Sequence, residues 1–407
     1  MNRRHFLMLP GTAFLMRRGS AQDQQAQQAG GASPTDTEQV LPDKLLLKDY
    51  RPKSIYKIPK TDIRKAKYPL IDVHHHARAK TPQDVDDLVK VMDAAGAERA
   101  VVFSGATGAR FDEVYRLYSK YPNRFYVWCS LDMTGVDQAG FGPAAVKELE
   151  RCRKVGAVGV GEITDKGMGI GGSIAGPPNW QGTRPAGGGG SGPRGGPARQ
   201  GLHPDDPRMD PLWEKCAELG MPINLHMSDP YWSYLPQDRY NDGLMNGFSW
   251  RLDNKPGIMG HNDLIESLER TLKRHPKTVF IACHLANLDY DLTRLGQMFD
   301  RNPNLYADIS ARFAETAPIP RFASQFLKKY AHRVCYATDM PYNQAMFSTT
   351  FRILESLDEH FYEQDLYFNF NYHWPMHGFG LPDDVLRKMY RETALNAFKQ
   401  AQKNAKV

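Results

Sequence analysis

The chain has 407 residues, of which 41% are hydrophobic and 24% are charged. These are ordinary values for a globular protein, and they exclude a wholly disordered chain. The net charge is +6, and part of it comes from Arg3, Arg4, Arg17 and Arg18, so the rest of the chain is close to neutral. No basic stripe indicates nucleic-acid binding, and no apolar run of 18 residues predicts a membrane-spanning helix.

The five cysteines predict buried thiols rather than a disulfide framework. Their number is odd, no CxxC pair occurs, and three of them lie in apolar, strand-like runs where cysteine behaves as a small hydrophobic residue. They are Cys129, Cys152, Cys216, Cys283 and Cys335.

The first 21 residues resemble a twin-arginine signal peptide. Arg3 and Arg4 precede Phe6 and a short apolar stretch, and small residues follow up to Ala21, which is the order of regions in an export signal. This predicts a bacterial protein that is exported to the periplasm, and a chance basic start is the alternative. Residues 22–66 are expected to form a disordered leader and an N-terminal arm, because 22–44 are rich in Gln, Ala, Gly, Asp and Thr.

From residue 67 onward, short apolar runs alternate with stretches of helical periodicity. The runs predict strands at residues 68–73, 99–103, 125–131, 157–163, 222–227, 278–285, 305–309 and 334–337. The periodic stretches predict helices at residues 82–95, 111–121, 143–154, 210–219, 262–274, 290–300, 320–331 and 345–358. Eight such units predict one (β/α)8 TIM-barrel domain over residues 67–400. An open, doubly wound sheet is the alternative, although no GxGxxG follows the first strand.

Residues 164–203 form a glycine-rich insertion after the fourth predicted strand. They contain four consecutive glycines at 187–190 and scattered prolines, a composition that supplies no core. An insertion after a barrel strand lies at the mouth where barrel active sites sit. The segment is therefore either a lid or a disordered insertion.

Six side chains with metal-binding chemistry lie at the C-terminal ends of predicted strands. His74 and His76 share one face of the first strand because alternate residues point the same way, and His75 points away. A closed barrel would bring the ends of all the strands together, and imidazole and carboxylate ligands suit zinc and similar divalent ions. The six residues are His74, His76, Glu162, His226, His284 and Asp339.

These motifs resemble the amidohydrolase superfamily. The likeness rests on DVHHH at 72–76, on the strand-end histidines 226 and 284, and on TDMP at 338–341. The closing stretches LPDDVL at 381–386 and TALNAF at 393–398 resemble the amidohydrolase-related branch that includes aminocarboxymuconate semialdehyde decarboxylase-like enzymes.

The resemblance implies roles for the matching residues. His74, His76 and His226 would bind one ion together with Asp339, and Asp339 would also take a proton from the water that the ion activates. His284 would either bind a second ion or act as an acid on the substrate. Glu162 would bridge two ions, or it would only pair with Lys166 or with an arginine of the insertion. One or two ions, most readily Zn²⁺, are therefore expected.

The residues around the predicted mouth suggest a small-molecule substrate. Arg78 and Arg312 are candidates to hold a carboxylate through a bidentate fork, and a solvated loop arginine is the alternative for each. Trp232 belongs to an aromatic group that is expected to form a wall against the substrate or to pack in an interface or a lid. The segment 368–379 is expected to cap the mouth or to form a contact in a homo-oligomer.

The sequence therefore predicts a metal-dependent hydrolase in which activated water attacks an ester, lactone or amide carbonyl, with Asp339 and His284 as catalytic residues. A zinc-dependent, non-oxidative decarboxylase is the first alternative. A non-catalytic barrel that only binds a metal or a ligand is the second.

Overall fold

The computed structural model describes residues 41–138, 141–173, 199–363 and 372–405. The chain divides into two units, residues 1–50 and 51–407. The described part of the first unit contains one short 3-10 turn, η1 (Leu47–Asp49). The predicted signal peptide, the leader up to residue 40, most of the insertion and part of the segment 368–379 lie outside the described residues.

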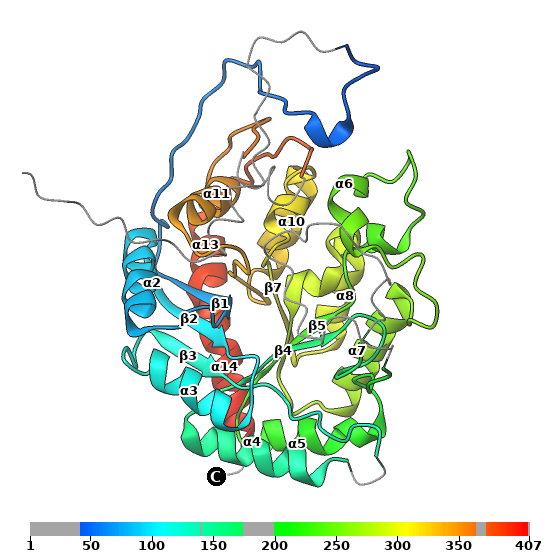
Figure 1. Ribbon diagram of the computed structural model, residues 1–407. Helices are drawn as coiled ribbons and strands as arrows, with labels where there is room; N and C mark the ends of the chain where they lie inside the picture. Colours follow the sequence, from blue (N-terminus) through cyan, green and yellow to red (C-terminus); the bar gives the residue numbers. More distant parts are fainter. Residues whose placement is uncertain (1–40, 139–140, 174–198, 364–371, 406–407) are drawn as a thin grey trace, which may run out of the picture. The chain divides into compact units, whose positions relative to one another are not determined.

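The second unit is built on eight short parallel strands. Figure 1 shows the labelled strands β1–β5 and β7 with helices around them. Strands β1–β3 form one sheet in sequence order, and strands β4–β8 form another. Their bounds are β1 (Leu70–His76), β2 (Ala97–Phe103), β3 (Phe125–Trp128), β4 (Val160–Asp165), β5 (Ile223–Met227), β6 (Phe280–Ala282), β7 (Leu305–Asp308) and β8 (Val334–Cys335).

Backbone contacts join the two sheets at both seams. Cys129, just after β3, forms a parallel bridge with Val160 of β4. At the other seam the Val73 amide of β1 donates to the Tyr336 carbonyl, just after β8, at 3.2 Å. The strand order and these contacts give the predicted (β/α)8 barrel, in which β1 and β8 are neighbours and their C-terminal ends lie together.

One long helix follows each strand, as the periodicity predicts. They are α2 (Pro82–Ala95), α3 (Gly108–Tyr118), α4 (Pro143–Val155), α5 (Asp210–Glu218), α7 (His261–Arg274), α8 (Leu292–Arg301), α10 (Pro320–Tyr330) and α11 (Gln344–Glu355). Helix α2 shows why the boundaries are readable from sequence. Thr81 and Asp84 form a capping box around Pro82, and Gly96 ends the helix with φ of 80°.

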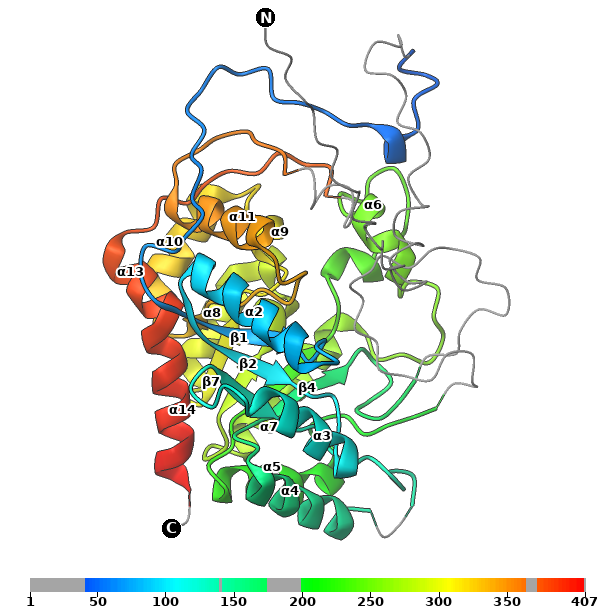
Figure 2. The same cartoon turned by 60° about the vertical axis from the view of Figure 1, so that its left-hand side comes forward.

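Short helical segments lie in the loops that follow the strands. They are η2 (Pro207–Met209), η3 (Tyr231–Tyr234), α6 (Leu244–Gly247), η4 (Phe248–Trp250), η5 (Cys283–Asn287), η6 (Asp289–Asp291) and α9 (Phe313–Thr316). The C-terminal part continues through α13 (Asp383–Arg387), a π-helical turn η7 (Lys388–Glu392) and α14 (Thr393–Asn404). Figure 2 shows α13 leading into α14, which runs to the C-terminus.

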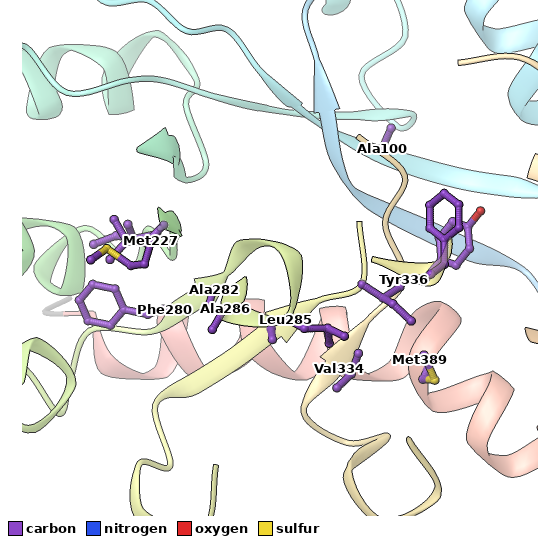
Figure 3. Close-up of a cluster of buried hydrophobic side chains, with 14 of the residues drawn as sticks. Ala100, Met227, Phe280, Ala282, Leu285, Ala286, Val334, Tyr336 and Met389 are labelled. Atoms are coloured by element: carbon purple, nitrogen blue, oxygen red, sulfur yellow. The ribbon is translucent and has the colours of Figure 1, made fainter. Parts of the chain in front are cut away.

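Alternate strand residues build two apolar clusters, one on each face of the strands. The larger cluster packs strands against helices, and Figure 3 shows part of it, with Phe280, Val334 and Met389 among its members. The smaller cluster includes Val73, Phe103 and residues of α14. Both faces of the sheet are therefore buried, as the continuous apolar runs predict.

The sixth strand is shorter than the sequence predicts. The apolar run at 278–285 indicates one strand, but β6 ends at Ala282 and residues 284–287 take left-handed conformations. A run of buried apolar residues does not by itself distinguish a strand from a buried turn. Among the described residues, no helix combines the length and the hydropathy needed to cross a membrane.

Candidate metal centre

Two of the three consecutive histidines of β1 face the same side. The rings of His74 and His76 lie 5.5 Å apart, centre to centre. His75 is buried on the other side against Tyr342, at 4.4 Å. Burial lowers the pKa of His75 to about 3, so this imidazole is neutral and belongs to the packing. The β1–β2 pairing is irregular between Asp72 and His75, directly before the histidines that face the site.

Two carboxylates from distant strands meet these histidines. Asp339 Oδ1 lies 3.0 Å from His76 Nε2 and 3.5 Å from His74 Nε2. Glu162 Oε2 lies 3.5 Å from His76 Nε2. Asp339 has φ of 50°, and its amide donates to the His74 carbonyl at 3.0 Å, so this backbone contact fixes the position of the carboxylate.

The other oxygen of Glu162 faces a second pair of histidines. Glu162 Oε1 lies 2.5 Å from His226 Nδ1 and 3.6 Å from His284 Nε2. His284 Nε2 also lies 3.7 Å from Asp339 Oδ2. Glu162 therefore lies between the two histidine groups, and its Oε1 also lies 3.8 Å from His74 Nε2. Lys166, which the sequence offered as an alternative partner, pairs with Asp229 instead, at 2.6 Å.

The turn that carries His284 is backbone-strained. Residues 284–287 all have φ between 52° and 57°, although none is glycine, and each such residue costs about 1–2 kcal/mol. Several hydrogen bonds hold the turn. The His284 amide donates to Asp308 at 2.9 Å, and the Asn287 side chain donates to the Met227 carbonyl at 2.9 Å. Strain held by surrounding contacts is common at functional sites.

The cluster fits a divalent cation on the chemistry of its donors. Ligand atoms of His74, His76 and Asp339 lie within 4.8 Å of one another, and the same is true of His74, Glu162, Cys283 and His284. His74 Nε2 is buried and has no hydrogen-bond partner among the described residues, although a buried polar atom normally has one. Nitrogen and oxygen donors of this kind suit zinc and related ions.

Cys283 is the weakest member of this set. Its thiol donates to Asn224 Oδ1 at 2.7 Å. Burial raises the pKa of the thiol well above its usual value, and only the thiolate is a good metal ligand. All five cysteines are free and buried, as the sequence predicts.

The charges of the centre are strongly coupled. Burial alone would lower the pKa of His74, but Asp339 and Asp308 outweigh it and raise the pKa to about 10. Burial would raise the pKa of Asp339, but His74 and His76 hold it below its usual range. A proton on His74 and a divalent cation would each neutralise the negative charge of the same carboxylates. Protonation of His74 and metal binding therefore compete.

Asp308, at the end of β7, contacts the centre and was not among the residues predicted from the sequence. Its Oδ2 lies 3.1 Å from His74 Nδ1, and its Oδ1 accepts the His284 amide and the Ser310 hydroxyl. His284 Nδ1 in turn lies 2.9 Å from the Ser310 carbonyl. These contacts orient both rings with Nε2 toward the carboxylates. The sequence offered one indication of its role: like the six predicted residues, Asp308 lies at the end of a strand.

A cavity of about 100 Å³ opens on the two carboxylates of the centre and on His76, His226 and His284. Apart from these, its wall contains two ion pairs, one joining Lys166 to Asp229 and one joining Arg312 to Glu315. The remaining wall residues are Pro230, Asn246, Trp250, Ala311, Met340 and Tyr372.

The three predicted substrate-binding residues are placed differently. Arg312 lies in the cavity wall and is buried. Arg78 is exposed and does not line the cavity, because it lies two residues beyond the end of β1 in the loop that leads to α2. Trp232 is half-buried, and its ring centre lies 5.7 Å from that of Trp374. Trp232 is not part of the cavity wall, whereas Trp250 is.

The match to a protein family agrees with the fold. A family model described as amidohydrolase matches residues 71–400, and no curated protein matches the sequence. Similar solved structures include an uncharacterized TIM-barrel protein from Bordetella bronchiseptica, with 15% identity, TM-score 0.47 and coverage of 82% of this chain and 99% of that one.

Two further structures are named for enzymes. The 4-oxalomesaconate hydratase from Rhodopseudomonas palustris has 14% identity and TM-score 0.43, over 82% of this chain and 97% of that one. The IDCase of Metarhizium anisopliae has 14% identity and TM-score 0.46, over 83% and 99%.

Proposed function

This chain belongs to the amidohydrolase family, and we propose that it is a metal-dependent hydrolase of a small-molecule ester, lactone or amide. The observation that carries the proposal is the convergence of His74, His76 and Asp339 within 4.8 Å. The buried Nε2 of His74, which has no hydrogen-bond partner among the described residues, supports it, because a divalent ion would supply that partner.

The donor set also supports a role for the ion. A divalent ion held here would acidify a water molecule and polarise a substrate carbonyl. Zn²⁺ is the ion we propose, because imidazole and carboxylate donors suit it. Glu162 contacts histidines of both groups, so it would help to hold a second ion if one binds.

Asp339 is the residue that we propose as the general base. Its two oxygens lie toward His76 and His284, at the edge of the cavity, where it can accept a proton from an attacking water. His284 also lines the cavity. Burial, more than any other cause, lowers its pKa to about 4, so its ring is neutral at pH 7 and is available as a ligand.

Metal analysis and a substrate screen test the proposal together. We expect at least one divalent ion per chain by elemental analysis, and turnover of esters, lactones or amides that stops when the ion is chelated. Asp339→Asn should lower kcat by about 10²-fold or more, whereas Asp242→Asn, at an exposed loop position, should not change it.

Two other outcomes would overturn the proposal. Carbon dioxide release from an aromatic carboxylate, without hydrolysis of any ester or amide, would identify a decarboxylase. Full metal occupancy without turnover of any substrate in the screen would identify a metal-binding barrel that is not an enzyme.

The cellular location is a separate proposal that rests on residues 1–21 alone. The paired Arg3 and Arg4 before an apolar stretch support export through a twin-arginine route to the periplasm. Expression with Arg3→Lys and Arg4→Lys should leave the protein inside the cytoplasm, and unchanged export would contradict the proposal.

A further inference from the structure

Two predicted ligands, His226 and His284, lie past the last residues that pair β5 with β6. The pairing between these strands ends with Leu225 opposite Ala282, whereas the two histidines follow those residues in the chain. Their ring centres nevertheless lie only 4.5 Å apart. Strand pairing between β5 and β6 therefore does not fix how the two rings lie relative to each other.

The side chain of Asn287 joins the turn of His284 to the segment that follows His226. Its amide nitrogen donates to the Met227 carbonyl at 2.9 Å and to the Ser228 carbonyl at 3.2 Å. Met227 is the residue directly after His226, and Asn287 is the third residue after His284. These two hydrogen bonds therefore continue the contact between the two chain segments beyond the point where strand pairing ends.

The oxygen atoms of Asn287 bind two further parts of the barrel. Arg312 lies in the loop after β7, and its Nε and Nη2 both donate to Asn287 Oδ1. His261 is the first residue of α7, and its Nε2 donates to the main-chain carbonyl of Asn287 at 2.9 Å. The side chain of Asn287 thus donates twice and accepts twice, which is the full number of hydrogen bonds that an asparagine side chain can form.

Burial and backbone conformation make these hydrogen bonds important. Asn287 is fully buried, and a buried amide that loses its partners carries a free-energy penalty. Residues 284–287 all lie in the left-handed region, with φ between 52° and 57°, which residues other than glycine adopt at a cost. Asparagine tolerates this region better than most residues do. The contacts of Asn287 therefore oppose relaxation of the strained turn.

We propose that Asn287 is a positioning residue of the metal centre, an inference that rests on the proposed function. Its side chain holds the turn of His284 against the segment after His226, and so keeps both imidazoles directed toward Glu162. Arg312 acts on the centre through its two hydrogen bonds to Asn287 Oδ1. Groups behind the ligands commonly tune the affinity of a site for its metal in this way.

Metal binding by the full chain tests the proposal without a substrate. In Asn287→Ala, we expect the affinity for Zn²⁺, measured by competition with a chromophoric chelator, to fall by about tenfold or more. The visible absorption bands of the Co²⁺-loaded variant should also differ from those of the wild type, because they report the coordination geometry. Asn287→Gly removes the same hydrogen bonds without strain in the left-handed region, and it serves if the alanine variant does not fold.

Asn304 provides a matched control at the other end of the barrel. It directly precedes β7 and is buried, and its side chain donates to the carbonyls of Leu272, His275 and Thr278 at 3.0–3.1 Å. Asn304→Ala should lower Tm, because it also removes buried hydrogen bonds. It should leave the Zn²⁺ affinity and the Co²⁺ spectrum unchanged. An equal loss of affinity in this variant would show that general destabilisation, rather than positioning, is the cause, and would overturn the proposal.

A variant of Arg312 tests the step that leads through Asn287. Arg312→Lys keeps the positive charge, but an ammonium group cannot reproduce the paired donors of the guanidinium. We expect a smaller fall in Zn²⁺ affinity than in Asn287→Ala. The double variant should bind Zn²⁺ no more weakly than Asn287→Ala alone, because the two residues share one set of contacts. Fully additive losses would contradict an action of Arg312 through Asn287.

The outcomes separate this inference from the proposed function. Zn²⁺ binding by the wild type without hydrolysis of any ester, lactone or amide would contradict the proposed function, while the affinities of the variants would still decide the inference. An affinity and a Co²⁺ spectrum in Asn287→Ala and Asn287→Gly equal to those of the wild type would overturn the inference alone. A wild type that binds neither ion would overturn both.

Discussion

At the scale of single residues, the centre depends on side chains that do not face the cavity. Asp308 is fully buried, and it contacts His74 through one oxygen and the His284 amide through the other. It also accepts from the side chain of Asn224 at 3.1 Å. A carboxylate behind a metal-binding imidazole fixes the tautomer and the direction of the ring.

Replacing Asp308 by Asn should therefore weaken metal binding. The amide can keep only part of these contacts, and we expect the affinity for Zn²⁺ to fall by about 10–100-fold. Competition with a chromophoric chelator measures this affinity without any substrate. Asp242→Asn is the control, with an affinity equal to that of the wild type. An unchanged affinity in Asp308→Asn would show that Asp308 has no positioning role.

At the scale of elements, Asp165 at the end of β4 ties together the two ends of the insertion. Its Oδ1 accepts from the amides of Gly167 and Gly169, and its Oδ2 lies 2.7 Å from His203 Nδ1. A bridge between Ile170 and Leu202 continues this contact. The described base of the insertion is therefore anchored next to the loop that carries Lys166.

This anchor should make stability depend on pH. The hydrogen bond to Asp165, more than any other cause, raises the pKa of His203 above its usual value, and Asp205 and Asp206 act in the same direction. A raised pKa in the folded state stabilises the protein below the unfolded pKa of about 6.5, and this contribution is lost as pH rises through the folded value. The free energy of unfolding of the wild type should therefore exceed that of His203→Gln. This difference should be larger at pH 6 than at pH 9.

His332 offers a control of opposite sign. Burial, followed by Arg333, lowers its pKa, so protonation of His332 opposes folding at low pH. His332→Gln should therefore gain stability relative to the wild type as pH falls. Denaturant unfolding at several pH values measures both differences. A difference for His203→Gln that does not change with pH would contradict the predicted role of the His203–Asp165 contact.

At the scale of the whole molecule, the ion should link the two sheets. The residues of the centre come from β1 in the first sheet and from β4, β5 and the loops after β6 and β8 in the second. The seams between the two sheets are joined by backbone hydrogen bonds and, between β3 and β4, by one bridge. A ligand that binds only the folded state raises its stability by mass action.

Removal of the ion should therefore lower Tm. With free Zn²⁺ at about 100 times its Kd, the gain is about 2.7 kcal/mol, which corresponds to about 5 °C for a domain of this size. Scanning calorimetry before and after chelation, and after adding the ion back, measures it. The Tm of His76→Ala, which lacks one predicted ligand, should change less when the ion is removed and added back. A Tm that stays the same after elemental analysis confirms loss of the ion would contradict this link.

The amino-acid sequence by itself determined the architecture and the six candidate ligands, because local periodicity marks helices and strands and because barrel strands end at one mouth. The family match and the fold confirm the architecture, whereas metal binding by the six residues stays a prediction. Only the tertiary structure decided which residues hold those side chains in place and which cationic side chains are already paired with other protein groups. His74 meets Asp308 across 234 residues, and Arg312 and Lys166 are both committed to protein partners. Such contacts depend on how distant segments pack, and no local pattern in the sequence encodes them.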